Sequence, residues 1–183
     1  MRFSRVVSQD TMAAVVILLV VFLFLHSAFF PLSVFISGDV GGSDFSDFYL
    51  PLKFLLGQSL KAGQLPVWAA KVGFGYPLLA EGQIQTFFPT TLLSLFFSPP
   101  LAFNLSLALT IFCLGFFTYL FLHKGLKLSS LSSLFAAFAF TFSAPIVMRW
   151  KHLSILGVVA LLPLELWLVT WFFQATPSCP RFR

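Results

Sequence analysis

Four long runs of hydrophobic residues divide the chain, and polar stretches separate them. None of the runs shows the alternation of apolar and polar positions that a half-buried strand or helix would have. A helix of about 20 apolar residues crosses a hydrocarbon core about 30 Å thick. The pattern therefore predicts an all-α integral membrane protein with about four transmembrane helices, at residues 12–36, 101–122, 128–148 and 153–173.

Residues 37–100, between the first and second predicted crossings, form one long polar loop. Within it, residues 49–61 place leucines on or near one face of a helix, with a proline in the first turn and a glycine after the end. We expect this helix to lie along the membrane surface. Residues 86–97 are apolar, but they are too few to cross and include Pro89. They are more typical of an interfacial or re-entrant segment.

Charged residues outside the apolar runs predict the orientation of the chain. Segments 1–11, 123–127 and 174–183 contain the cationic residues Arg2, Arg5, Lys124, Lys127, Arg181 and Arg183. The only acid in these segments is Asp10. Because positive charge favours the cytoplasmic side, we predict that both chain ends are cytoplasmic. The long loop and residues 149–152 are then extracytoplasmic.

The composition supports a membrane protein and excludes several other classes. Hydrophobic residues make up 58% of the chain and charged residues 9%, against about 25% charged residues in soluble domains. The 11 Lys and Arg residues are scattered and form no stripe, so the predicted partner is membrane lipid and no nucleic acid. Two cysteines, Cys113 and Cys179, support neither a disulfide framework nor a thiolate metal site. The oligomeric state is left open.

Three acids, Asp39, Asp44 and Asp47, follow the first predicted crossing and are candidate catalytic residues. A carboxylate at the membrane boundary is partly desolvated, which raises its pKa and suits it to act as a base toward a hydroxyl group. The alternative is that these acids are solvated or cap a helix, with Asp47 as the N-cap residue. Such carboxylates suit a divalent cation such as Mg²⁺, but their spacing gives no complete ligand set. We predict no metal site, and the cofactor is left open.

Two further groups of polar residues are candidates for substrate binding. Glu81 and Gln83 follow a glycine-rich stretch and offer hydrogen-bonding groups to a sugar, although a loop packed on the membrane surface explains them equally well. Arg149, Lys151 and His152, at the end of the third predicted crossing, are suited to a lipid-linked phosphate.

The alternative for this cationic group is an interfacial anchor centred on Trp150. Glu165 is the one acid inside an apolar run, and burying its charge at mid-bilayer would cost about 2.5 kcal/mol or more. We therefore expect Glu165 to face protein, to pair or to be protonated. A role in transport is the function that this residue suggests.

The order of motifs in the long loop resembles a known family. The motifs are an Asp-rich turn, Phe48-Tyr49-Leu50-Pro51-Leu52-Lys53, Gly63-Gln64-Leu65-Pro66-Val67-Trp68, Gly73-Phe74-Gly75-Tyr76-Pro77-Leu78-Leu79-Ala80-Glu81-Gly82-Gln83 and Phe87-Phe88-Pro89. This order resembles the amino-terminal part of bacterial YfhO-like polytopic membrane proteins, which are membrane glycosyltransferases of the GT-C type. The resemblance covers residues 12–173.

The resemblance implies an activity and a location. It implies a multi-pass protein of the bacterial plasma membrane that transfers a sugar from a polyprenyl-phosphate donor to an extracytoplasmic acceptor. Asp44 is then the first choice for the active-site acid, with Asp39 and Asp47 as alternatives, and Arg149 or Lys151 stabilises the departing phosphate. Family members are much longer, so we expect the chain to be an amino-terminal portion with a cytoplasmic tail at residues 174–183, and to be inactive alone if donor or acceptor surfaces lie in the missing part. The alternative is a non-catalytic multi-pass protein, either half of a transporter or an assembly partner.

Overall fold

The computed structural model describes residues 2–34 and 45–175 of the chain. Within these residues every regular element is a helix or a helical turn, and there is no β-strand. The prediction of an all-helical chain is therefore confirmed for the part that the structure describes.

Three helices are long and apolar enough to span a membrane: α1 (Arg2–Phe29), α4 (Pro99–Leu120) and α7 (Leu153–Ala175). Their candidate spans are Gln9–Phe29, Pro99–Gly125 and Leu153–Ala175, with 21, 27 and 23 residues. At 1.5 Å per residue even the shortest span reaches about 32 Å, which is enough for a hydrocarbon core of about 30 Å. These helices overlap the stretches where the sequence predicts the first, second and fourth crossings.

The third predicted crossing is not one continuous helix. Helix α5 (Ser130–Thr141) has 12 residues, and a turn separates it from the four-residue helix α6 (Ala144–Val147). The break is explained by Pro145, because a proline ring collides with the carbonyl group four residues earlier, and that residue is Thr141. The 12 residues of α5 extend only about 18 Å. The expectation of a single helix over residues 128–148 is therefore wrong.

The chain divides into two compact units. The helical unit comprises Met1–Phe24, Thr110–Val147 and Leu156–Arg183, and the loop unit comprises Leu25–Leu109 and Met148–Ile155. Each unit is built from segments that lie far apart in the sequence, so long-range contacts hold both together.

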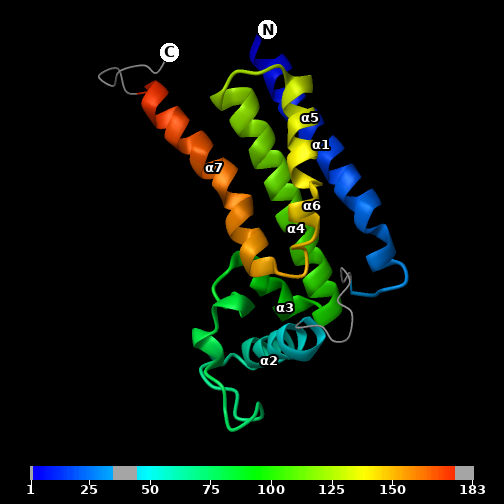
Figure 1. The fold of residues 1–183 in the computed structure, drawn as a ribbon, viewed down its shortest axis with the longest axis vertical. Helices are drawn as coiled ribbons and strands as arrows, with labels where there is room; N and C mark the ends of the chain where they lie inside the picture. Colours follow the sequence, from blue (N-terminus) through cyan, green and yellow to red (C-terminus); the bar gives the residue numbers. More distant parts are fainter. Residues whose placement is uncertain (1, 35–44, 176–183) are drawn as a thin grey trace. The chain divides into compact units, whose positions relative to one another are not determined.

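In the helical unit, α1, α4 and α5 lie side by side (Figure 1). Gly115 of α4 sits where Ile17 of α1 and Thr141 of α5 approach most closely, and a Cβ atom at this position would lie 3.1 Å from Ile17 Cγ2 and 3.2 Å from Thr141 Oγ1. Lys124 also forms an ion pair with Asp10, which lies in the amino-terminal part of α1. Within the described residues, Gly115 and the Asp10–Lys124 ion pair thus contribute to the packing of this unit.

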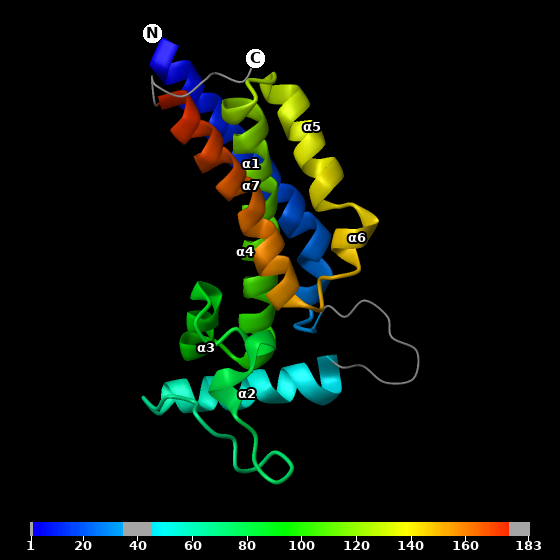
Figure 2. The ribbon, with the colours of Figure 1, turned by 60° about the vertical axis from the view of Figure 1, so that its left-hand side comes forward.

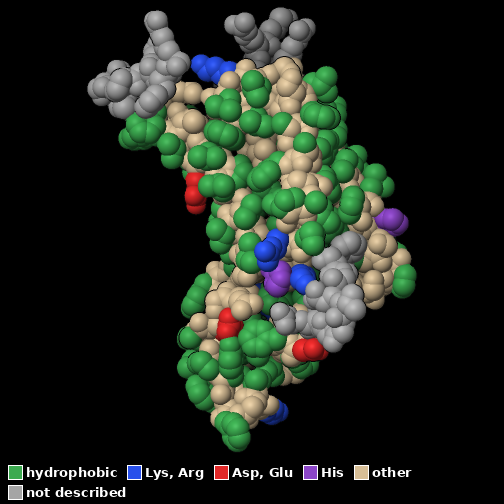
Figure 3. Space-filling view, viewed as in Figure 1, with side chains coloured by type: hydrophobic (Ala, Val, Ile, Leu, Met, Phe, Trp, Pro, Cys, Tyr) green, Lys and Arg blue, Asp and Glu red, His purple; other side chains and the backbone are tan. Residues whose placement is uncertain are grey.

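The outward faces of the long helices are apolar, as expected for surfaces that contact lipid. On the face shown in Figure 3, hydrophobic side chains cover most of the long helices and charged side chains are few. Glu165 is an exception, because its side chain is exposed on α7. Of the three outcomes expected for Glu165, the structure excludes only contact with protein within the described chain.

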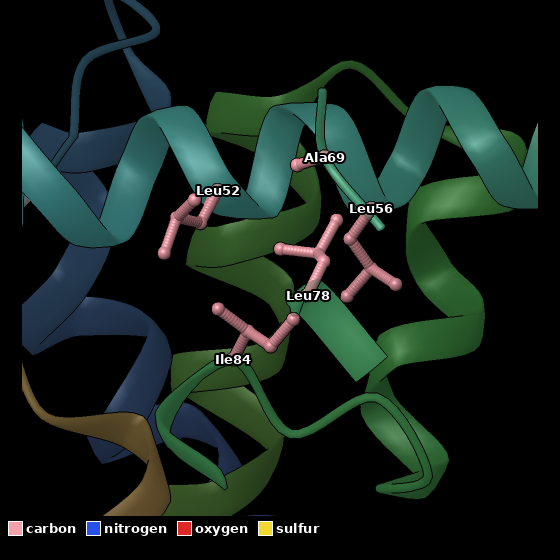
Figure 4. Close-up of a cluster of buried hydrophobic side chains, with 5 residues drawn as sticks. All are labelled: Leu52, Leu56, Ala69, Leu78 and Ile84. Carbon is pink, nitrogen blue, oxygen red and sulfur yellow. The ribbon is translucent and has the colours of Figure 1, made fainter. Parts of the chain in front are cut away.

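The loop unit is built around α2 (Leu50–Lys61), which the sequence predicted from its leucine spacing. Leu52 and Leu56 of α2 point toward Leu78 and Ile84, and Ala69 completes this buried cluster (Figure 4). The remaining elements are the helical turns η1 (Phe45–Tyr49), η2 (Leu78–Ala80), η3 (Gly82–Ile84) and η4 (Pro89–Leu92) and the short helix α3 (Leu93–Phe96). Burying one leucine contributes about 1.5–3 kcal/mol, so this cluster accounts for much of the stability of the unit.

The local sequence explains where α2 begins and where it ends. Pro51 occupies the first turn, where the missing amide hydrogen costs nothing. At the other end Gly63 has a φ of +69° and its amide donates to the carbonyl of Leu60, which satisfies one of the last carbonyl groups of the helix. Within the loop unit α2 lies across the first turns of α4 (Figure 2).

Candidate functional site

The acid-rich segment is described only at its end. Asp39 and Asp44 lie outside the described residues. Asp47 is exposed on η1 and accepts a hydrogen bond from Ser46 Oγ at 3.0 Å. Helix α2 begins after Tyr49 without a side-chain cap, so the interpretation of Asp47 as an N-cap residue is wrong.

Aromatic packing holds the turn that carries Asp47 against the start of α4. The ring of Phe45 lies 4.7 Å from that of Phe103, and the ring of Tyr49 lies 6.2 Å from it. Burial raises the pKa of Tyr49, so its hydroxyl stays neutral. Within the described residues this hydroxyl has no hydrogen-bond partner. The acidic segment therefore leads directly into a rigid aromatic contact.

The motif residues of the loop fold onto one another. The backbones of Ala69 and Tyr76 exchange two hydrogen bonds of 2.8 and 3.1 Å, which close a turn. Inside the turn Gly75 has a φ of +108°, and a Cβ atom there would lie 2.6 Å from the Trp68 ring. Only glycine satisfies both conditions. The close packing of the Gly75 backbone on the Trp68 ring thus explains why glycine occupies position 75.

Glu81 serves this loop as a hydrogen-bond acceptor. The Tyr76 hydroxyl donates to one oxygen of the Glu81 carboxylate, and the amide of Gln83 donates to the other at 3.0 Å. The bond to Glu81 raises the pKa of Tyr76. The side chain of Gln83 is exposed. The structure therefore brings the predicted pair Glu81 and Gln83 together and gives Glu81 a role in shaping the loop.

The predicted cationic group lies on a turn between α6 and α7. Arg149 is exposed, Lys151 and His152 are half-buried, and the amide of His152 donates to the carbonyl of Arg149 at 2.8 Å. Trp150 is 0% exposed. The interpretation of Trp150 as an interfacial anchor facing lipid is therefore wrong, since its ring belongs to the core of the loop unit.

Sequence reasoning missed a pocket between α2, α3 and the start of α4. The pocket has an empty volume of about 540 Å³ including its open mouth, and its polar lining comes from Lys53, Gln58, Lys61, Thr91, Ser94 and Ser106. The two amines are held at separate places on the wall. Lys53 Nζ lies 3.3 Å from Thr91 Oγ1, and Lys61 Nζ lies 3.3 Å from the carbonyl oxygen of Phe97.

A signal for one wall of this pocket was present in the sequence. Lys53, Gly57 and Lys61 follow one another at intervals of four residues, which places them on one side of the predicted helix. The opposite wall gave no signal, because it comes from residues about 30 to 100 positions further along the chain. Among the described residues no group of three His, Cys, Asp or Glu side chains is arranged to hold a metal ion.

Comparisons with known proteins do not assign the chain to a family. No protein-family model matches it. No curated protein and no solved structure matches it either. The resemblance to YfhO-like proteins therefore stays a prediction from the sequence motifs.

Proposed function

We propose that this chain is a membrane glycosyltransferase-like protein of the GT-C type, acting on the extracytoplasmic side of a bacterial plasma membrane. The observation that carries the proposal is the link between the acidic segment and the lysine-lined pocket. Phe103 contacts Phe45 and Tyr49 on the acidic side, and the same residue lines the pocket. Phe103 thus joins the turn that carries Asp47 to a pocket that contains cations, and an acid and cations are the groups that sugar transfer from a phosphate requires.

The reaction would proceed by displacement at the anomeric carbon of a polyprenyl-phosphate sugar. An aspartate, with Asp44 as the first choice and Asp47 and Asp39 as alternatives, takes the proton of the acceptor hydroxyl. The acceptor oxygen forms its bond to the anomeric carbon as the bond to the phosphate oxygen breaks. The polyprenyl phosphate leaves with that electron pair, and cations such as Arg149 or Lys151 stabilise its charge.

We further propose that the chain crosses the membrane four times, the third time as the broken pair α5 and α6. Two sets of contacts support this count. The beginnings of α4 and α7 both lie in the loop unit, where Ser106 Oγ donates to the carbonyl of Thr90 and Gln85 Nε2 donates to that of Leu153. Their far ends meet where Gln174 Nε2 donates to the carbonyl of Gly125 at 3.1 Å. These contacts support a path in which residues 126–152 return from one side to the other.

A reporter fused after Arg183 tests the number of crossings. Four crossings with a cytoplasmic amino terminus leave the fusion in the cytoplasm, where green fluorescent protein fluoresces and alkaline phosphatase stays inactive. Three crossings reverse both signals. Active phosphatase at this position would overturn the proposed topology.

The activity is tested by following the donor. Membranes from bacteria that produce the chain are incubated with a panel of polyprenyl-phosphate hexoses, and the released polyprenyl phosphate is measured by mass spectrometry. We expect release with the unaltered chain, none with Asp44→Asn, and unchanged release with Glu165→Gln, which removes an acid from α7. Release that survives Asp44→Asn would refute the assignment of Asp44, and no release from any donor would refute transfer by this chain alone.

The alternative, a non-catalytic component such as a transporter half or an assembly partner, is favoured by one observation. Glu165 is exposed midway along the apolar helix α7, where a carboxylate needs a partner or a proton. A substrate flux in proteoliposomes that depends on Glu165 would support transport instead of transfer.

A further inference from the structure

The lysine-lined pocket of the loop unit contains two amines, Lys53 and Lys61. Lys53 is half-buried, and its neighbours are the neutral hydroxyl of Thr91 and the ring of Tyr49, whose centroid lies 5.7 Å from Nζ. Burial lowers the pKa of Lys53 to about 8. Among residues 9–34 and 45–175 no carboxylate is paired with either lysine of the pocket. Two amines thus share one cavity without a counter-ion from the described chain.

The remaining polar side chains of the pocket are Gln58, Thr91, Ser94 and Ser106. The hydroxyls of Thr91 and Ser106 already donate to backbone carbonyls, so the further donors to a phosphate oxygen are the Ser94 hydroxyl and the Gln58 amide. Gly57 stands between the two lysines on α2, and a Cβ atom there would be 3.4 Å from Ser94 Cβ. Because Gly57 has no side chain, α2 and α3 approach closely and the lysines and hydroxyls converge on one volume.

The rest of the lining is apolar and aromatic. Phe54, Phe97 and Phe103 contribute rings to the lining. A small hydrated anion gains nothing from such walls. A ligand with a charged head and a hydrocarbon chain uses both kinds of surface.

We propose that the pocket between α2, α3 and α4 binds the phosphate head group of an anionic amphiphile, with Lys53 and Lys61 as the cationic contacts and the aromatic walls against the first part of its chain. Only the identity of the natural ligand, a lipid-linked sugar, rests on the proposed function. Binding itself requires no transfer and involves residues separate from the candidate acids.

Binding is measured with the full chain purified in a neutral detergent. The probes are farnesyl phosphate, which has both a phosphate and an apolar chain, farnesol, which lacks the phosphate, and inorganic phosphate, which lacks the chain. We expect farnesyl phosphate to bind at least about tenfold more tightly than either of the other two, since each lacks one kind of contact. Equal binding of farnesol would overturn the role of the lysines, and equal binding of inorganic phosphate would overturn the role of the apolar walls.

Substitution separates the pocket from other cationic surfaces. The double variant Lys53→Gln/Lys61→Gln should lose at least about tenfold in affinity for farnesyl phosphate. Lys71→Gln is the matched control, because Lys71 is exposed in the same unit and does not line the pocket. A double variant that binds as well as the unaltered chain, or a loss of the same size in the control, would contradict the proposal.

A footprinting experiment on the unaltered chain gives an answer even if the double variant misfolds. Acetic anhydride modifies accessible amines, and mass spectrometry reports the extent at each lysine. Farnesyl phosphate should protect Lys53 and Lys61 and leave Lys71 unchanged. Absence of protection at Lys53 and Lys61 at saturating ligand would refute this site. The donor-release assay can fail while this protection persists, so failure of the transferase and failure of the binding site give different results.

Discussion

The two compact units use different features of the sequence to define their structure. In the helical unit, long helices satisfy their own backbone groups, and the contacts depend on side-chain volume, as Gly115 between Ile17 and Thr141 illustrates. In the loop unit, short helices and turns leave backbone groups open, and side chains such as Asn104 and Thr91 donate to them. The first unit is therefore sensitive to the size of a residue, and the second to its backbone conformation and its hydrogen bonds.

The largest effect is expected at Gly75 in the loop unit. Gly75→Val combines an unfavourable positive φ with a collision against the Trp68 ring, at about 1–3 kcal/mol for each. Hydrogen exchange measured by mass spectrometry should then be faster at the amides of Ala69 and Tyr76. Gly73→Val is the control, because Gly73 has a φ of +55° with nothing within 4 Å, so only the backbone cost applies. Equal effects at the two glycines would show that contact with Trp68 is unimportant.

In the helical unit the corresponding position is Gly115. Gly115→Leu should destabilise the unit by about 3 kcal/mol, since the new side chain overlaps Ile17 and Thr141. The thermal midpoint in detergent measures the loss. The double variant Ile17→Ala/Gly115→Leu should recover part of it because the alanine makes room. Additive losses in the double variant would contradict a direct contact between these two positions.

The comparison also explains which features could be predicted from sequence. The leucine spacing at Leu52 and Leu56 predicted α2, because an amphipathic helix needs only local information. The apolar run over residues 128–148 concealed the break before Pro145, since hydropathy does not register the collision between a proline ring and a carbonyl group. The pocket depended on contacts between distant segments. Lys53 and Thr91, for example, are 38 positions apart, and their proximity has no local signature.

The third prediction concerns hydrogen bonding in the loop unit. Asn104 Nδ2 donates to the carbonyl groups of Ala28 and Ser33 at 2.9 and 2.7 Å. Asn104→Leu removes both bonds, although the Ala28 carbonyl keeps the bond from the Ser33 amide, and the loss should cost about 2 kcal/mol. The thermal midpoint should fall, and hydrogen exchange should accelerate around residues 28–33. Ser154→Ala, which truncates a half-buried polar side chain elsewhere in this unit, is the control and should change little. A variant of Asn104 as stable as the unaltered chain would show that these two bonds contribute nothing net.

The smallest predicted effect depends on pH and concerns Lys53. Its pKa in the folded chain is about 8, below the ordinary value of 10.5, so between these values the unfolded chain binds more protons. Stability therefore rises with pH through this window, and below about pH 8 the full cost of the charged, half-buried amine applies. Above about pH 10 the raised pKa of buried Tyr49 acts in the opposite direction, because there the unfolded chain loses its proton first.

Lys53→Met removes this titration and keeps a side chain of similar length. The variant should be more stable than the unaltered chain at pH 7, and the difference should shrink by pH 9.5, as thermal midpoints at both values would show. The groups around Lys53 are the Tyr49 ring, the Thr91 hydroxyl and the second pocket amine, Lys61. A difference that stays constant with pH would mean that Lys53 is as well solvated as an exposed lysine. In that case the pocket would lack the uncompensated charge that draws a phosphate into it.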